Sequence, residues 1–181
     1  MLAVTRHVHY ARHFTLLVCI AALLIVTSRW RVSPGAAYSF AIYGALHASV
    51  LAASLRDRQP LVRQILFVAI AALLCMLTAR LGLYGMRFAG KLPSFAGPWL
   101  LLAAVSGVGA LSYGILIRRF WIRDLSLDAF GITAIFCILA ECAALIVGNH
   151  YQVLGGLWLA IPWWFAFSAG LCYYEHRRSR R

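Results

Sequence analysis

One acidic residue, Glu141, lies deep inside a long apolar stretch of the chain, where a carboxyl group is costly. The stretch 127–147 is predicted to be a membrane-spanning helix, and helical rise puts Glu141 about 6 Å beyond its midpoint. A carboxylate at that depth must be paired, protonated or in contact with a water-filled cavity. Two interpretations stay open: Glu141 belongs to a functional polar site, or it holds two helices together.

Arg80 is the candidate countercharge for Glu141. It lies in the apolar stretch 61–84, about 10 Å beyond the midpoint by helical rise. The two stretches are expected to run in the same direction, so both charges fall in the same half of the membrane. The side chains can meet if the two helices are neighbours. Alternatively, the guanidinium of Arg80 extends along its helix to the lipid headgroups.

His47 is a third candidate, because it lies near the centre of the apolar stretch 36–55. At helical spacing it shares one face with Ser39, Tyr43 and Ser54. A comparable polar face on another helix consists of Thr133, Cys137 and Glu141. Faces of this kind line a bundle interior or a ligand cavity. For His47 itself, a hydrogen bond between helices is the alternative.

Two adjacent tryptophans, Trp163 and Trp164, follow Pro162 near the middle of the last apolar stretch. Tryptophan prefers the membrane interface, so a pair of indoles at mid-membrane is unusual. The functional interpretation is an aromatic wall for a flat ligand. The alternative is packing of bulky side chains against lipid or a neighbouring helix. The predicted ligand-binding residues are therefore Glu141, Arg80, His47, Trp163 and Trp164.

No cofactor or metal is predicted. Haem needs two axial histidines at matching depth, but His47 is near mid-membrane, His13 at the inner edge and His150 in an outer connection. The cysteines lie inside apolar stretches and form no C-x-x-C pair, so a disulfide framework is not expected either. These cysteines are Cys19, Cys75, Cys137, Cys142 and Cys172.

Catalytic signatures are missing from the sequence. It has no H-E-x-x-H, no G-x-S-x-G and no phosphate-binding loop. The other four acids, Asp57, Asp124, Asp128 and Glu175, fall in connections or at helix ends. No catalytic residue is predicted, and an intramembrane enzyme that uses Glu141 and His47 is the least favoured of the functions considered.

Composition shows what kind of scaffold must position these residues. Hydrophobic residues make up 63% of the 181 residues and charged residues 12%. A soluble domain carries about 45–50% apolar and about 25% charged residues, so the natural surroundings of this chain are lipid. The net charge of +12 comes from short connections and not from one helix face, which argues against nucleic acid as a partner. A single integral membrane domain, 1–181, is predicted.

The predicted fold is an all-α, polytopic transmembrane bundle of six helices. The apolar stretches are 14–30, 36–55, 61–84, 97–117, 127–147 and 153–174. A helix needs about 20 residues to cross a hydrocarbon core of about 30 Å. The first stretch is short enough to be a signal peptide, but Arg29 and Arg31 follow it where a cleavage site needs small neutral residues, so a retained helix is favoured.

Basic residues orient the bundle. Of 17 lysines and arginines, 12 fall on the side of the N-terminus and only five on the other side. Those five are Arg29, Arg31, Arg80, Arg87 and Lys91. Because positive charge gathers in the cytoplasm, the N-terminus is predicted to be cytoplasmic, and an even number of helices returns the C-terminus to the same side. The membrane is expected to be the bacterial inner (plasma) membrane.

The expected partners are the lipid bilayer and, through a face of small residues, other membrane subunits. Ser106, Ala110 and Gly114 follow one another at intervals of four residues, which lets helix backbones approach closely. A solute carrier, or the membrane-embedded substrate-binding subunit of a transporter, is the favoured function. A non-catalytic accessory or assembly subunit is the alternative. A cavity around Glu141 would support the first, and sealed packing the second.

Overall fold

The computed structural model describes residues 8–28, 36–55, 59–89, 96–123, 125–148 and 157–179. Over these ranges the fold is all-helical, as the sequence predicts. Its helices are α1 (Tyr10–Ser28), α2 (Ala36–Ser54), α3 (Leu61–Ala89), α4 (Ala96–Phe120), α5 (Leu127–Gly148) and α6 (Leu157–Ser179). Each of the six apolar stretches therefore forms one helix, and residues 29–30 and 153–156 of the predicted spans lie outside the described residues.

The helix boundaries differ from the predicted spans by five residues at the ends of α3 and α6, and by four residues at the start of α1. This helix begins at Tyr10, about one turn before the predicted start at Phe14. The backbone N–H of His9 donates to the carbonyl of Ser54 at 2.9 Å. That carbonyl is one of those at the end of α2 that have no partner within their own helix. The pairing fixes the start of α1 beside the end of α2.

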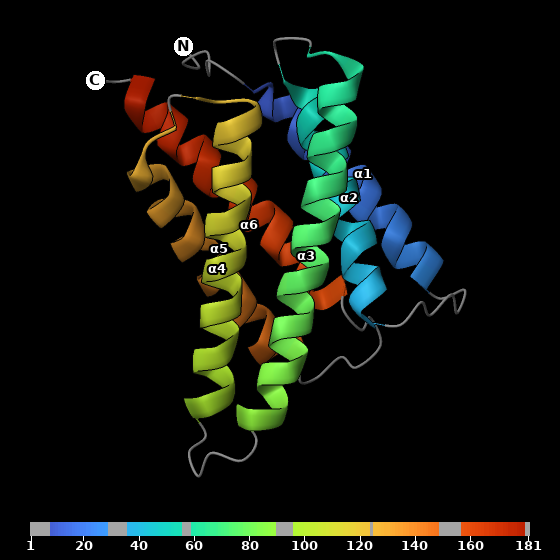
Figure 1. Cartoon of the computed structure of the whole chain (residues 1–181), viewed down its shortest axis with the longest axis vertical. Helices are drawn as coiled ribbons and strands as arrows, with labels where there is room; N and C mark the ends of the chain where they lie inside the picture. The colour runs from blue at the N-terminus through green and yellow to red at the C-terminus, as the bar shows by residue number, and fades with distance from the viewer. Residues whose placement is uncertain are drawn as a thin grey trace.

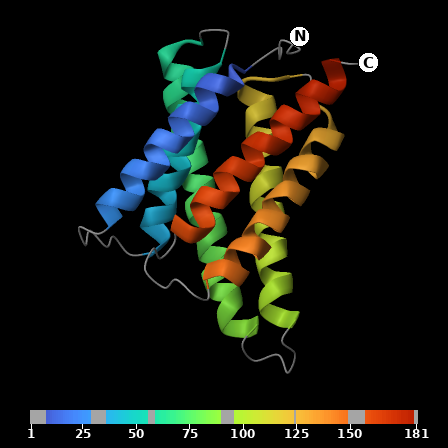
Figure 2. The same cartoon turned by 180° about the vertical axis from the view of Figure 1, so that it is seen from behind.

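The helices form a ring in which each packs against the next (Figure 1). The ring closes because α6 packs against α5, α1 and α2. Figure 2 shows α6 crossing the bundle at a slant, with α1 on one side and α5 on the other. The start of α1 and the end of α6 lie at the same end of the bundle, which we call the N-terminal end; the opposite end is the far end.

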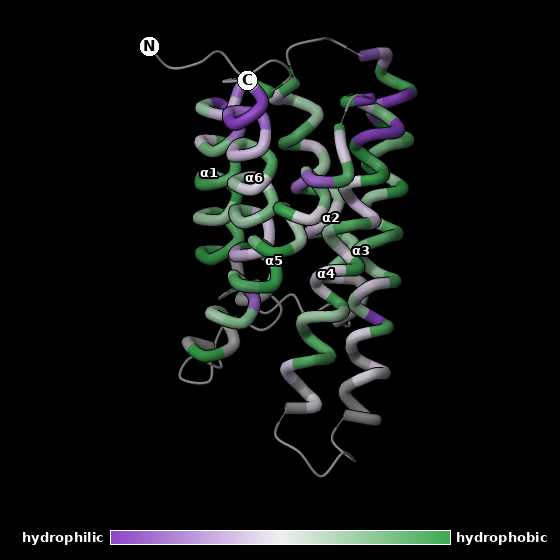
Figure 3. Tube along the Cα trace, turned by 90° about the vertical axis from the view of Figure 1, so that its left-hand side faces the viewer, coloured by the Kyte–Doolittle hydropathy of each residue, from purple (hydrophilic) through white to green (hydrophobic). Residues whose placement is uncertain are grey.

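Within the described residues, three helices contain segments long and apolar enough to cross a membrane: Leu61–Gly82, Trp99–Phe120 and Leu127–Ala144. Two shorter apolar segments, Tyr10–Val26 and Ser39–Ser54, lie in α1 and α2. Hydrophobic residues follow one another along most of each helix, and hydrophilic residues gather at the N-terminal end (Figure 3). Large apolar side chains are exposed on the outside of α3, among them Leu66 and Leu73. These properties suit association with a membrane.

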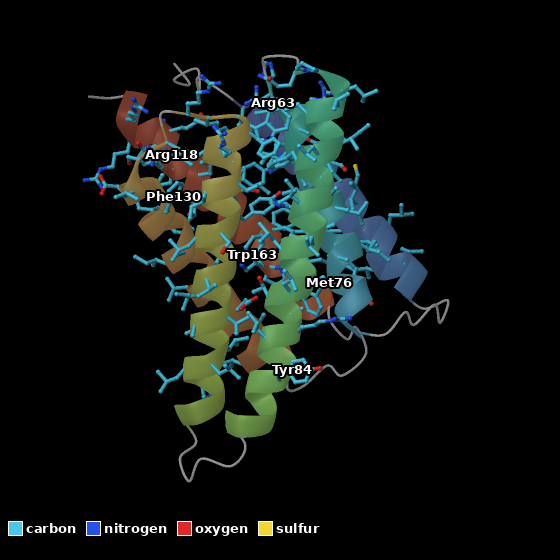
Figure 4. The ribbon with its side chains drawn as sticks, viewed as in Figure 1. Arg63, Met76, Tyr84, Arg118, Phe130 and Trp163 are labelled. Atoms are coloured by element: carbon cyan, nitrogen blue, oxygen red, sulfur yellow. The ribbon has the colours of Figure 1, made fainter. Side chains whose placement is uncertain are left out.

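Apolar side chains fill the N-terminal half of the bundle. Phe67, Ile117, Phe167 and Leu171, from three different helices, are at most 2% exposed and belong to one buried cluster. A Cβ atom added at Gly114 of α4 would lie 2.8 Å from the ring of Phe130. Phe130 lies in α5 (Figure 4).

The small face of α4 packs within the chain. Ser106 and Ala110 are buried, and Gly114 contacts α5. Contact of this chain with other membrane subunits stays a prediction.

Candidate functional site

A cavity of about 190 Å³ lies between α2, α3, α4, α5 and α6. It extends from Gly82 and Leu101, toward the far end, to Tyr113 in the middle of the bundle. Most of its wall is apolar. The aromatic side chains that line it are Phe40, Tyr43, Tyr113, Trp163 and Trp164. Figure 4 shows Trp163 pointing between α3 and α4. The cavity suits a small ligand with an apolar body.

Glu141 is the only acidic residue among the described residues that line this cavity. Its Oε2 atom is buried and has no hydrogen-bond partner. The hydroxyl of Ser106 lies beside the carboxyl group, although it makes no hydrogen bond of regular geometry. A buried carboxyl oxygen without a partner is costly, so a donor group on a bound molecule would relieve that cost.

The tryptophan pair, Trp163 and Trp164, forms one wall of the cavity, and its role in binding a ligand stays a prediction. The Trp164 ring meets Tyr43 edge to face, with 6.2 Å between ring centroids. The Trp163 ring meets Tyr113 in the same way at 5.7 Å. Both pairs fall in the separation range that favours edge-to-face aromatic contacts. The indoles are thus held by neighbouring rings, and their positions are set by packing across α2, α4 and α6.

His47 lies behind this wall and is 1% exposed. Its Nδ1 faces the hydroxyl of Tyr113 at 3.1 Å, and its Nε2 faces the hydroxyl of Ser168 at 3.3 Å. The imidazole stacks on Trp164, with ring centroids 5.9 Å apart and an interplanar angle of 17°. His47 therefore does not line the cavity but contacts residues that do. Its hydrogen bonds run between helices.

The depth comparison between His13 and His47 is wrong. The two ring centroids are 5.9 Å apart, and the Nε2 of His13 is 2.7 Å from the same Ser168 hydroxyl. The backbone contact between His9 and Ser54 aligns α1 and α2, and α1 begins at Tyr10, so His13 lies inside the bundle instead of at its edge. His13 is fully buried.

Arg80 is exposed on α3 and is not among the residues that line the cavity. Its neighbours Thr78 and Ala79 do line it. The predicted meeting of Arg80 and Glu141 required α3 and α5 to be adjacent, but α3 packs against α2 and α4, and α5 packs against α4 and α6. The pairing of these two charges stays a prediction. The structure brings Glu141 together with Trp163 and Trp164, and does not bring Arg80 into that group.

Sequence reasoning missed two polar residues at the centre of the bundle, Tyr113 and Ser168. Tyr113 is seven residues after Ser106 and shares its helix face, which was the signal available. Ser168 had no such signal, because a lone serine in an apolar helix is common. In the part of the chain that the structure describes, no three His, Cys, Asp or Glu side chains are grouped to hold a metal ion. All five cysteines are free thiols.

Comparison of the chain with models of protein families, with curated proteins and with solved structures found no significant match.

Proposed function

We propose that this chain is an integral membrane protein that binds a small apolar amine in the cavity beside Glu141, as a solute carrier or as the substrate-binding subunit of a transporter. The observation that carries the proposal is the buried Glu141 carboxyl, one oxygen of which has no hydrogen-bond partner, in the wall of an otherwise apolar and aromatic cavity. Sites of carriers are typically built near mid-membrane from several helices, and five helices contribute here.

The chemistry of the wall indicates the ligand class. Aromatic rings attract a cation by their π faces, typically with about 0.5–2 kcal/mol. A carboxylate forms charge-assisted hydrogen bonds with an ammonium group. The volume of about 190 Å³ admits one ring with a short side chain more readily than a large solute. A primary amine on a single ring matches all three properties.

The alternatives have less support. An accessory subunit would be expected to seal Glu141 by packing, whereas this carboxyl lines a cavity. An enzyme would be expected to hold a base within hydrogen-bond reach of Glu141. The two ring nitrogens of His47 face Tyr113 and Ser168 instead.

The proposed topology has six spans with both ends in the cytoplasm of a cell whose inner (plasma) membrane holds the protein. Helices α1 and α2 have 19 residues each, a length of about 28 Å, close to the hydrocarbon thickness of about 30 Å. The excess of basic residues on the N-terminal side supports the orientation. Single cysteines at positions 57 and 91 test it. If a cysteine at position 91 is labelled only after the cells have been permeabilised, the proposed orientation is contradicted.

Binding of 2-phenylethylamine to the purified protein, measured by calorimetry, tests the ligand class. We expect Glu141→Gln to remove a hydrogen bond to a charged group, about 1.5–3 kcal/mol, which weakens binding by about 10- to 150-fold. Asp128→Asn is the matched control, since Asp128 is an exposed acid on the same helix. The uncharged analogue ethylbenzene should bind wild type and Glu141→Gln equally.

Equal binding of the amine by wild type and Glu141→Gln would refute the role of the carboxyl. Absence of amine binding by the wild-type protein would refute the ligand class.

A further inference from the structure

A continuous chain of buried polar groups leads from the cavity wall toward the N-terminal end of the bundle. Tyr113 lies in the wall, and its hydroxyl is 3.1 Å from the Nδ1 of His47. The Nε2 of His47 is 3.3 Å from the Ser168 hydroxyl, and that hydroxyl is 2.7 Å from the Nε2 of His13. All four side chains are at most 2% exposed. They come from α4, α2, α6 and α1, so the chain crosses the bundle without passing along any single helix.

Two hydrogen-bond arrangements satisfy this chain equally. In the first, Tyr113 donates to His47, His47 donates to Ser168, and Ser168 donates to His13. In the second, every donor and acceptor is exchanged, so that His13 donates to Ser168 and His47 donates to Tyr113. Each neutral imidazole has one N–H and one acceptor nitrogen, and a hydroxyl can both donate and accept, so both arrangements are chemically complete.

We propose that Tyr113, His47, Ser168 and His13 form a proton relay between the cavity and the N-terminal end of the bundle. With this relay the protein moves protons as well as binding a ligand, which goes beyond the proposed function. It rests on the proposed function only for its entrance, the cavity wall at Tyr113.

One proton enters and one leaves in each passage. A donor in the cavity gives a proton to the Tyr113 oxygen while the Tyr113 hydroxyl proton moves to Nδ1 of His47. The Nε2 proton of His47 moves to Ser168, and the Ser168 hydroxyl proton moves to Nε2 of His13. His13 then releases its Nδ1 proton toward the N-terminal end. This passage converts the first arrangement into the second. A change of tautomer at both imidazoles, together with rotation of the two hydroxyl groups, restores the first.

In the part of the chain that the structure describes, the hydrogen-bonded chain ends at His13, and groups that can exchange a proton lie near it. The Nδ1 of His13 is buried and has no hydrogen-bond partner. Tyr10 lies on the same face of α1, with its ring centroid 6.5 Å from that of His13. The hydroxyl of Tyr10 lies close to the carboxyl of Glu175, which is 7% exposed in the last turns of α6. The remaining titratable neighbours are Cys172 beside Tyr10, and Cys75, which faces Tyr113 from α3.

A purely structural role explains the arrangement less well. Helices in lipid pack well through small and apolar side chains, and hydrogen bonds between membrane helices average only about 0.6 kcal/mol. Ionisable residues inside a membrane are rare and typically mark ion or proton pathways. Two imidazoles joined by one hydroxyl, with a phenol at the cavity, form a conducting sequence and not an isolated contact.

Proton flux into liposomes that contain the full-length protein tests the relay. A potassium gradient with valinomycin sets an inside-negative potential, and an enclosed pH-sensitive dye reports acidification. We expect wild-type flux well above that of protein-free liposomes, measured with and without 2-phenylethylamine. Loss of a proton-transfer group typically slows transfer by roughly 10²-fold or more, so His47→Gln, Tyr113→Phe and Ser168→Ala should each fall to the level of protein-free liposomes.

Matched variants outside the relay should keep the flux. His9→Gln, Tyr173→Phe and Ser49→Ala change the same groups at exposed positions. Ser168→Ala removes only one hydroxyl, and its thermal unfolding is compared with wild type to show that the bundle remains folded. Should His47→Gln fail to fold, Tyr113→Phe and Ser168→Ala decide the outcome.

Wild-type flux equal to that of protein-free liposomes, both with and without the amine, would overturn the relay. Wild-type flux retained by Tyr113→Phe and Ser168→Ala would overturn it as well. The two proposals fail separately: flux without amine binding refutes the ligand class alone, and amine binding without flux refutes the relay alone.

Discussion

Gly170 of α6 permits the close approach of α6 to α5. Substitution of Gly170 by alanine tests this approach, because it adds a methyl group between the two helices. A Cβ atom at position 170 would lie 2.9 Å from the Cα of Thr133 and 3.1 Å from its Cγ2. The first of these is a backbone atom, which cannot rotate out of the way. Gly170→Ala therefore forces α5 and α6 apart.

The expected loss of stability follows from two opposing effects. Overpacking of a well-packed interior costs about 1–3 kcal/mol, and contact with a backbone atom places this site in the upper part of that range. Alanine regains about 0.5–1 kcal/mol relative to glycine inside a helix. The net loss is about 1–2 kcal/mol, and each kcal/mol corresponds to about 2–4 °C in Tm for a chain of this size.

The matched control is Gly131→Ala on α5. A Cβ atom there meets nothing within 4 Å, so only the gain in helix propensity remains and Tm should rise by about 1–4 °C. Thermal unfolding of both variants in the same detergent, followed by circular dichroism, gives the comparison. The packing of α5 on α6 described above would be refuted if Gly170→Ala unfolded at or above the wild-type temperature.

Three further predictions follow from buried contacts. Gly44→Ala should lower Tm, because a Cβ atom would lie 2.7 Å from both Cβ and Sγ of Cys75; thermal unfolding measures it. Ser168→Ala should lower Tm by several degrees, since two buried histidine nitrogens lose their common partner at a cost of about 1–3 kcal/mol; an unchanged Tm would contradict the hydrogen bonds described. An apolar maleimide should modify Cys19, which is exposed, well before Cys137, which is buried; mass spectrometry of the labelled peptides reports the order.

The helices could be predicted from sequence because a long apolar segment has few ways to satisfy its backbone hydrogen bonds away from water. Backbone groups that cannot reach water must pair within the segment, so each apolar stretch of sufficient length becomes a helix. The start of α1 was not predicted correctly, because it depends on a contact between α1 and α2. The sequence places His13 at the inner edge, but His9 pairs with Ser54 and His13 is buried inside the bundle. A tertiary contact of this kind cannot be predicted from the pattern of hydrophobic residues along the sequence.

The candidate site was predictable only in part, because sequence gives depth but not neighbours. The cost of a buried carboxyl identified Glu141, and the unusual depth of two indoles identified Trp163 and Trp164. The partner expected for Glu141 depended on which helices are adjacent, and α3 and α5 both pack against α4 instead. Ser168 joins His13 to His47 because α6 crosses the bundle at a slant (Figure 2), which no spacing in the sequence indicates.

The distribution of packing gives the two proposals a common physical basis. Between the cavity and the N-terminal end the bundle is filled by Phe67, Ile117, Phe167 and Leu171. A close-packed aromatic and aliphatic core leaves no room for a ring-sized solute. A proton needs no such room, because it passes by exchange along hydrogen bonds that already exist. In this conformation the ligand and the proton would thus reach the centre by different routes, and they meet at Tyr113, which lines the cavity and begins the relay.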